Sequence, residues 1–248
     1  MVLIYFLVAL LSTICGSMAG LGGGVIIKPV LDFLGDYNIE TIGVLSACTI
    51  FSMALVSVIK QLSYKSKIDI KNTGLLGQKL LTFILKIVQG RIVSLVQSGI
   101  LALLLIFVYI YMNNKEKFKS YKIDNFILST IIGIFLGLIA AFLGIGGGPI
   151  NVAFLTIFFS MEAKNAARDS VLIILFSQAS KLLTIAFGTG FSGYDLSMLP
   201  YMIFGGVLGG FIGAKFNRIF SNEIILRVFN TITILIIGLN IYNFITAI

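Results

Sequence analysis

The 248-residue chain has no histidine, no tryptophan and only two cysteines, and just ten of its residues are acidic. Without histidine, the commonest proton relay and metal ligand is missing. Cys15 and Cys48 both lie in apolar runs and do not have the spacing of metal ligands, and they require no oxidising compartment. Nearly all of the acidic residues lie between apolar runs. The sequence therefore predicts no catalytic constellation, no metal site and no cofactor.

Hydrophobic residues make up 58% of the chain and charged residues only 11%, with a mean hydropathy of +1.06. A soluble core of this size does not need so much apolar surface, so we expect a multi-pass membrane protein. The net charge of +8 comes mainly from short polar loops, where Lys and Arg fix topology, and indicates no nucleic-acid partner. The first run, Met1 to Leu11, lacks Lys and Arg and is interpreted as a transmembrane segment, not as a signal peptide.

Polar breaks divide the chain into two halves of five hydrophobic segments each. The expected domains are a first transmembrane repeat (1–112), a polar linker (113–124) and a second transmembrane repeat (125–248). The expected segments are 2–18, 25–34, 42–59, 73–85 and 92–112 in the first half, and 126–142, 149–161, 169–187, 197–214 and 228–247 in the second. An odd number of segments in each half predicts two repeats of opposite orientation in an all-α membrane fold.

The distribution of Lys and Arg supports this topology. With the N-terminus outside, thirteen of these residues fall in inside loops and two, Lys86 and Arg91, fall in outside connections. Such a bias is typical of cytoplasmic loops and predicts that the linker 113–124 faces the cytoplasm. The second segment of each half, such as Val25 to Leu34, is too short to cross a hydrocarbon core of ~30 Å. We expect each first and second segment to form a hairpin that turns within the membrane.

Two glycine-rich stretches, Ala19 to Gly24 and Leu143 to Gly148, stand at these turns. Backbone exposed at membrane depth must be covered by protein or line a wet cavity. Each half-helix that follows presents unpaired N–H groups and a partial positive charge, and two such termini converging from inverted repeats would form an anion site. Close helix packing is the alternative role of these glycines. The candidate substrate-binding residues at the turns are Gly22, Gly23, Gly24, Val25, Gly146, Gly147, Gly148, Ile150 and Asn151.

Further polar residues lie inside apolar segments. Lys28 follows Gly24 by four positions, and Ser177, Gln178 and Lys181 lie in the third segment of the second half. A buried cation is usually paired or faces a cavity, so these four residues join the candidate substrate-binding set, although each Lys could instead extend to the headgroups. Ser46 and Ser170, near the starts of the third segments, are expected to bond back to the preceding helical turn.

A third glycine-rich stretch runs from Gly205 to Gly213. Its glycines are spaced at four, so that they share one helix face. Small residues with this spacing are typical of close packing between membrane helices, and we assign the stretch that role.

The motifs Ala19 to Gly24 with Pro29 and Leu31, Gly144 to Asn151, Phe158 to Met161 and Ile173 to Gln178 resemble the two repeat signatures of the sulfite exporter TauE/SafE family. Lys28 departs from that pattern, because the family usually has an apolar residue there. The resemblance covers essentially the whole chain. It implies a permease in the prokaryotic plasma membrane that moves sulfite or organosulfur anions such as sulfonates. It leaves open a coupling proton or cation and a homo-oligomer.

These observations predict a secondary transporter of small anions, not an enzyme, that works by alternating access around the two glycine turns in the bilayer. Two alternatives remain open at the level of the sequence. A passive anion channel would share every static feature. An intramembrane sulfur-handling protein would use Cys15 or Cys48.

Overall fold

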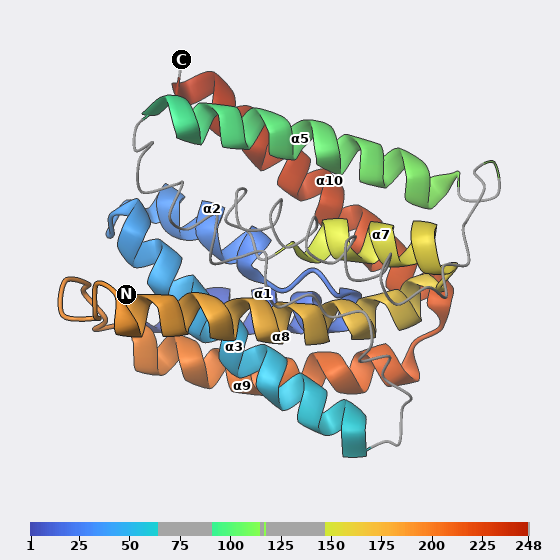
Figure 1. Ribbon diagram of the computed structural model, residues 1–248, viewed down its shortest axis with the longest axis horizontal. Helices are drawn as coiled ribbons and strands as arrows, with labels where there is room; N and C mark the ends of the chain where they lie inside the picture. The colour runs from blue at the N-terminus through green and yellow to red at the C-terminus, as the bar shows by residue number, and fades with distance from the viewer. Residues whose placement is uncertain (64–90, 115–116, 118–146, 248) are drawn as a thin grey trace.

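The computed structural model describes residues 1–63, 91–114, 117 and 147–247, and every regular element within these residues is a helix (Figure 1). Each helix falls on one of the predicted segments. The predicted segments 73–85 and 126–142 and the candidate residue Gly146 lie outside the described residues. The helices are α1 (Val2–Ala19), α2 (Gly24–Leu34), α3 (Ile39–Ser63), α5 (Arg91–Asn113), α7 (Gly148–Phe159), α8 (Ala163–Phe187), α9 (Leu199–Ile219) and α10 (Asn222–Ala247).

Five of these helices are long and apolar enough to cross a membrane: α1, α3, α8, α9 and α10. By contrast, α2 has 11 residues and α7 has 12, so each is about half the length that a bilayer requires. The all-helical membrane fold and the two short helices are therefore confirmed.

Two helices begin more than a full turn earlier than the hydrophobic pattern predicts. The helix α8 begins at Ala163 instead of position 169, and α10 begins at Asn222 instead of position 228. Each added turn contains polar residues, and these turns are held by contacts between the two helix ends. The backbone N–H of Lys164 donates to Asn222 Oδ1 over 3.0 Å, and its ammonium donates to the carbonyl oxygens of Arg218 and Phe220 over 2.9 and 2.8 Å. A hydrophobic pattern cannot report a polar first turn that is held by neighbouring loops.

Corresponding helices of the two halves run in opposite directions (Figure 1). The half-helices α2 and α7 both begin near the middle of the bundle and point toward opposite ends of it. The helices α3 and α8 also run in opposite directions, and so do α5 and α10. Inverted repeats require this arrangement. The orientation of the two halves relative to a membrane remains a prediction.

The glycines of α9 pack closely against two neighbouring helices. A Cβ atom added to Gly205 would lie 2.9 Å from the carbonyl oxygen of Phe6 on α1. One added to Gly213 would lie 2.5 Å from the carbonyl oxygen of Ile14 on the same helix. On the adjacent face, a Cβ at Gly210 would lie 2.5 Å from the carbonyl oxygen of Met53 on α3. The predicted packing role of this stretch is confirmed, and it places α9 against both α1 and α3.

Candidate functional site

The first glycine turn reverses the chain between α1 and α2. Gly20, Gly22 and Gly23 have φ angles of 74°, 80° and 67°, a backbone conformation that is strained for residues with a side chain. The N–H of Gly22 donates back to the carbonyl oxygen of Gly16 on α1 over 3.3 Å. Glycine is therefore required here by the backbone itself.

The second turn shows the same geometry where it is described. Gly147 has a φ of 75° and precedes α7, as Gly23 precedes α2. Pro149 occupies the first turn of α7, where its missing N–H costs no helical hydrogen bond. Each half-helix begins one residue earlier than the sequence predicts, at Gly24 and at Gly148.

The two turns meet inside the protein. The backbone of Leu21 fills the space that a side chain at Gly148 would need, and Leu21 is completely buried. On α8, Ile174 covers Gly22, and the backbone of Ala167 lies against Gly20. The N-terminal ends of α2 and α7 thus converge beneath α8, as the inverted-repeat hypothesis requires.

Ser170 on α8 links both turns. Its hydroxyl donates to the carbonyl oxygen of Gly20 over 2.7 Å and lies 3.4 Å from that of Gly148. Because a hydroxyl has one proton, the shorter contact is the principal hydrogen bond. The predicted bond back to the preceding helical turn was wrong for Ser170, since its partner is on another element. The matching residue on α3, Ser46, is completely buried, and its Oγ has no partner within the described part of the chain.

The first turns of α2 and α7 hold the remaining candidates near this contact. Val25, Ile150 and Asn151 are each 1% exposed. The amide nitrogen of Asn151 has no hydrogen-bond acceptor among the residues that the structure describes. An unpaired buried donor is costly in a protein interior. It therefore provides hydrogen-bonding capacity that an anion would satisfy.

The glycines also allow close packing, which was the alternative role considered for them from the sequence. The backbone of Gly23 occupies the space beside Gly16, just as Leu21 occupies the space beside Gly148. In this conformation the two turns are in direct contact, and an anion between them would require the turns to separate.

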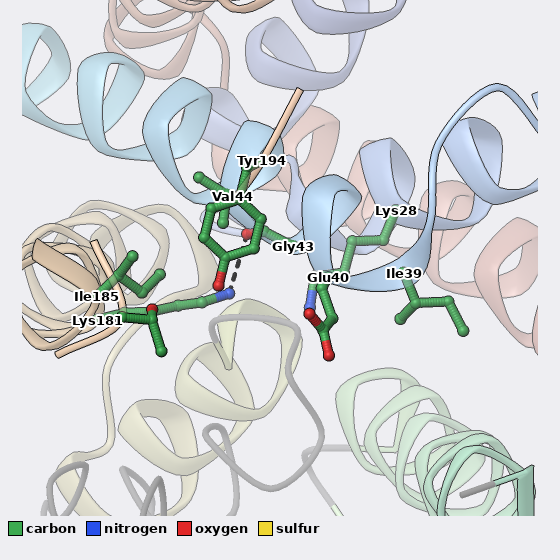
Figure 2. A pocket seen from close by; sticks show the side chains of 9 residues that line it. Lys28, Ile39, Glu40, Gly43, Val44, Lys181, Ile185 and Tyr194 are labelled. Atoms are coloured by element: carbon green, nitrogen blue, oxygen red, sulfur yellow. Dashed lines mark hydrogen bonds between the residues drawn. The ribbon is translucent and has the colours of Figure 1, made fainter. Parts of the chain in front are cut away.

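A cavity of about 340 Å³ lies further along α2. Figure 2 shows Lys28 and Lys181 approaching it from opposite sides, from α2 and α8. Its lining residues come from α2, α3, α8 and the loop 188–198, and they are Lys28, Ile39, Glu40, Gly43, Val44, Lys181, Ile185, Thr189 and Tyr194. The structure thus places two of the predicted candidates in one cavity.

The ammonium of Lys181 is held within the bundle. It donates to the carbonyl oxygen of Gly43 on α3 over 3.0 Å, drawn as a dashed line in Figure 2. This hydrogen bond joins α8 to α3 and directs the side chain inward instead of toward the headgroups. The other two candidates on α8 do not line the cavity: Gln178 is 4% exposed, and Ser177 lies one turn before Lys181.

Hydrogen bonds connect the loops at the end of the bundle where the cavity lies. The hydroxyl of Tyr5 donates to Asp36 Oδ2 over 2.7 Å, and the hydroxyls of Tyr37 and Ser197 lie 3.0 Å apart. In the same loop, the backbone N–H of Ser197 donates to Asp195 over 3.0 Å and lowers the pKa of that exposed carboxyl. These contacts connect the α2–α3 loop, the loop 188–198 and the start of α1 beside the cavity.

Sequence reasoning missed Glu40, Gly43 and Tyr194 as cavity residues. Glu40 lies in the first turn of a helix, where an acidic residue is ordinary, and Tyr194 lies in a short loop. The only available signal was the presence of two Lys residues within apolar segments, which implies that something polar lies near them.

Comparisons with known proteins agree with this architecture. A family model described as "Sulfite exporter TauE/SafE" matches residues 5–241. A "probable membrane transporter protein" of Methanocaldococcus jannaschii is 27% identical over 199 residues, which cover 74% of this chain and 70% of the relative. No solved structure matches the chain.

Proposed function

This chain belongs to the sulfite exporter TauE/SafE family of membrane transporters, and from that membership we propose that it is a secondary transporter of small anions in the prokaryotic plasma membrane. Its proposed cargo is sulfite or an organosulfur anion such as a sulfonate. The transport site lies where the two glycine turns meet, and alternating access exposes it to one side of the membrane at a time.

The observation that carries this proposal is the contact between the turns at Leu21 and Gly148. It brings together two helix N-termini, whose partial positive charges and unpaired N–H groups favour anions. Val25 and Ile150 supply backbone N–H groups in the first turns, and Asn151 adds a buried amide donor that lacks an acceptor among the described residues. Together they provide hydrogen-bond donors for oxyanion oxygens near the middle of the bundle.

Direct packing of the turns favours a transporter over an open channel. A channel requires a continuous wet path, whereas here Leu21 fills the space beside Gly148, and Ile174 covers Gly22. Movement of one repeat against the other would separate the turns and expose the site, which is the form of alternating access that inverted repeats provide.

The test is counterflow in proteoliposomes that contain the purified protein. Vesicles loaded with unlabelled sulfite or ethanesulfonate should accumulate labelled anion transiently and with saturation. A channel would give flux that does not saturate and shows no counterflow. Vesicles that show neither counterflow nor net flux of sulfite or ethanesulfonate would contradict the proposed function.

A cysteine-free variant tests the alternative in which the protein acts through the thiol of Cys15 or Cys48. Cys15 and Cys48 are both unpaired, and Cys15 packs against a hydrophobic core cluster. Replacing both cysteines with Ala should leave anion counterflow intact. Loss of counterflow in a folded double variant would support the alternative in which a thiol takes part in the function.

A further inference from the structure

We propose that the cavity between Lys28 and Lys181 is an additional binding site, separate from the glycine turns, for a small organic anion with one charged head group and a short apolar tail. The inference rests on the proposed function and deepens it, because it names the class of anion that this chain accepts. The site would hold the anion at the end of the bundle formed by the α2–α3 loop and the loop 188–198.

The charges around the cavity favour an anion with a single negative charge. Lys28, Lys181 and Glu40 give the described lining a net formal charge of +1. A monovalent anion would neutralise that charge, whereas a divalent anion would leave an excess negative charge in a partly desolvated space. Burying an uncompensated charge is costly.

Hydrogen-bond donors are available on both sides of the cavity. An ammonium group has three N–H bonds, and Lys181 uses one of them for Gly43. For the Lys28 ammonium, the structure gives no hydrogen bond or ion pair with another residue in the described ranges. Two ammonium groups that approach from opposite sides suit a head group with two or three oxygens, such as a carboxylate or a sulfonate (Figure 2).

The size and the remaining walls of the cavity indicate a tail. Ile39, Val44 and Ile185 form apolar walls beside the two ammonium groups. The cavity measures about 340 Å³, whereas a water molecule takes about 30 Å³ of liquid, so an inorganic oxyanion with only a few heavy atoms would fill a small part of it. Pockets for organic molecules begin at about 300 Å³ and combine apolar walls with a few polar groups.

The experiment is a titration of the purified full-length protein in detergent with two series of monovalent anions. Alkanesulfonates from methane- to butanesulfonate and the carboxylates from acetate to pentanoate are compared with inorganic sulfate, which has no tail. Affinity should rise about fourfold per added methylene until the cavity is filled. The two series show whether a sulfonate or a carboxylate head is preferred. Tightest binding of sulfate, or affinity independent of chain length, would overturn the proposal.

Variants locate the site. Lys28→Gln should weaken binding of every anion in the preferred series by about ten- to a hundredfold, and Glu40→Gln should strengthen it by about two- to tenfold, because one removes an attractive charge and the other a repulsive one. Ile185→Ala should reduce the gain per methylene to below twofold while the shortest anion still binds. The control is Lys60→Gln, since Lys60 lies 4.0 Å from the centre of the Phe211 ring, away from the cavity. Unchanged affinity in a folded Lys28→Gln protein would overturn the proposal.

The transport assay separates this inference from the proposed function. If sulfite counterflow is normal but the organic anions do not bind, the cavity site is contradicted and the transporter stands. If no anion moves in proteoliposomes, the proposed function itself fails, whatever binds in the cavity.

Discussion

The hydroxyl of Ser170 lies 2.7 Å from the carbonyl oxygen of Gly20, a residue 150 positions earlier in the chain. This bond connects the crossing helix α8 to the first glycine turn, and Ser170 also lies beside the start of α7. Any motion that separates the two turns must change these contacts. Ser170 is therefore placed to couple the position of α8 to the closure of the turns.

Ser170→Ala should destabilise the closed arrangement of the turns. The buried carbonyl oxygen of Gly20 would lose its donor, which costs about 1–3 kcal/mol. Thermal unfolding in detergent should shift to lower temperature. Ser63→Ala is the control, because Ser63 is exposed and, among the described residues, its hydroxyl donates to the carbonyl oxygen of Ile59 in its own helix. Equal effects of the two substitutions would contradict a special role for Ser170.

Gly148→Ala should disrupt the contact between the turns, because the added methyl group would collide with the backbone of Leu21. Backbone atoms cannot move aside as a flexible side chain does, so we expect the free energy of unfolding to fall by about 1–3 kcal/mol, as is typical of overpacking. We also expect counterflow to be lost. Gly238→Ala on α10 is the matched control, since Gly238 is also helical and an added Cβ atom there would have no atom of the described residues within 4 Å beyond its own helix backbone. That variant should keep its stability and its transport.

Hydrophobic patterning was sufficient to predict the eight helices of the described residues, because each apolar run there forms a single helix. It could not place α8 and α10 at their polar first turns, since Lys164 and Asn222 fix those turns through contacts with each other. The packing of Gly205 to Gly213 was predictable because spacing at four is a local property of one helix.

The candidate site was predictable only in part. The two turns were recognisable because each needs glycine for its own backbone conformation, and Lys28 and Lys181 stood out as charges within apolar runs. The cavity residues that α3 supplies were not predictable: Glu40 and Gly43 reach the cavity only through the packing of α3 against α2 and α8. The partner of Ser170 was also hidden, because local sequence favours a bond within its own helix and says nothing about Gly20.

The two ends of the bundle should lie on opposite sides of the membrane. Single cysteines at Ser63 and Gly193, introduced into a protein without Cys15 and Cys48, should react with an impermeant thiol reagent from the cytoplasmic and the external side, respectively. Both positions are exposed, and a Cβ atom at Gly193 would have no neighbour within 4 Å among the described residues other than those adjacent in the chain. The reason is the excess of Lys and Arg in the predicted inside loops. Labelling of both cysteines from one side would contradict the predicted inverted topology.

Lys181→Gln should separate the charge of this residue from its structural contact. Glutamine can still donate a hydrogen bond toward Gly43, whose carbonyl oxygen is the partner of the Lys181 ammonium. If the ammonium also contacts the anion, losing that charge should weaken affinity by roughly 1.5–3 kcal/mol, or about ten- to a hundredfold. Lys60→Gln, which removes a cation away from the cavity, should change affinity little. A normally folded Lys181→Gln protein with unchanged affinity would show that Lys181 serves only to join α8 to α3, and anion selectivity would then depend on the helix N-termini at the glycine turns.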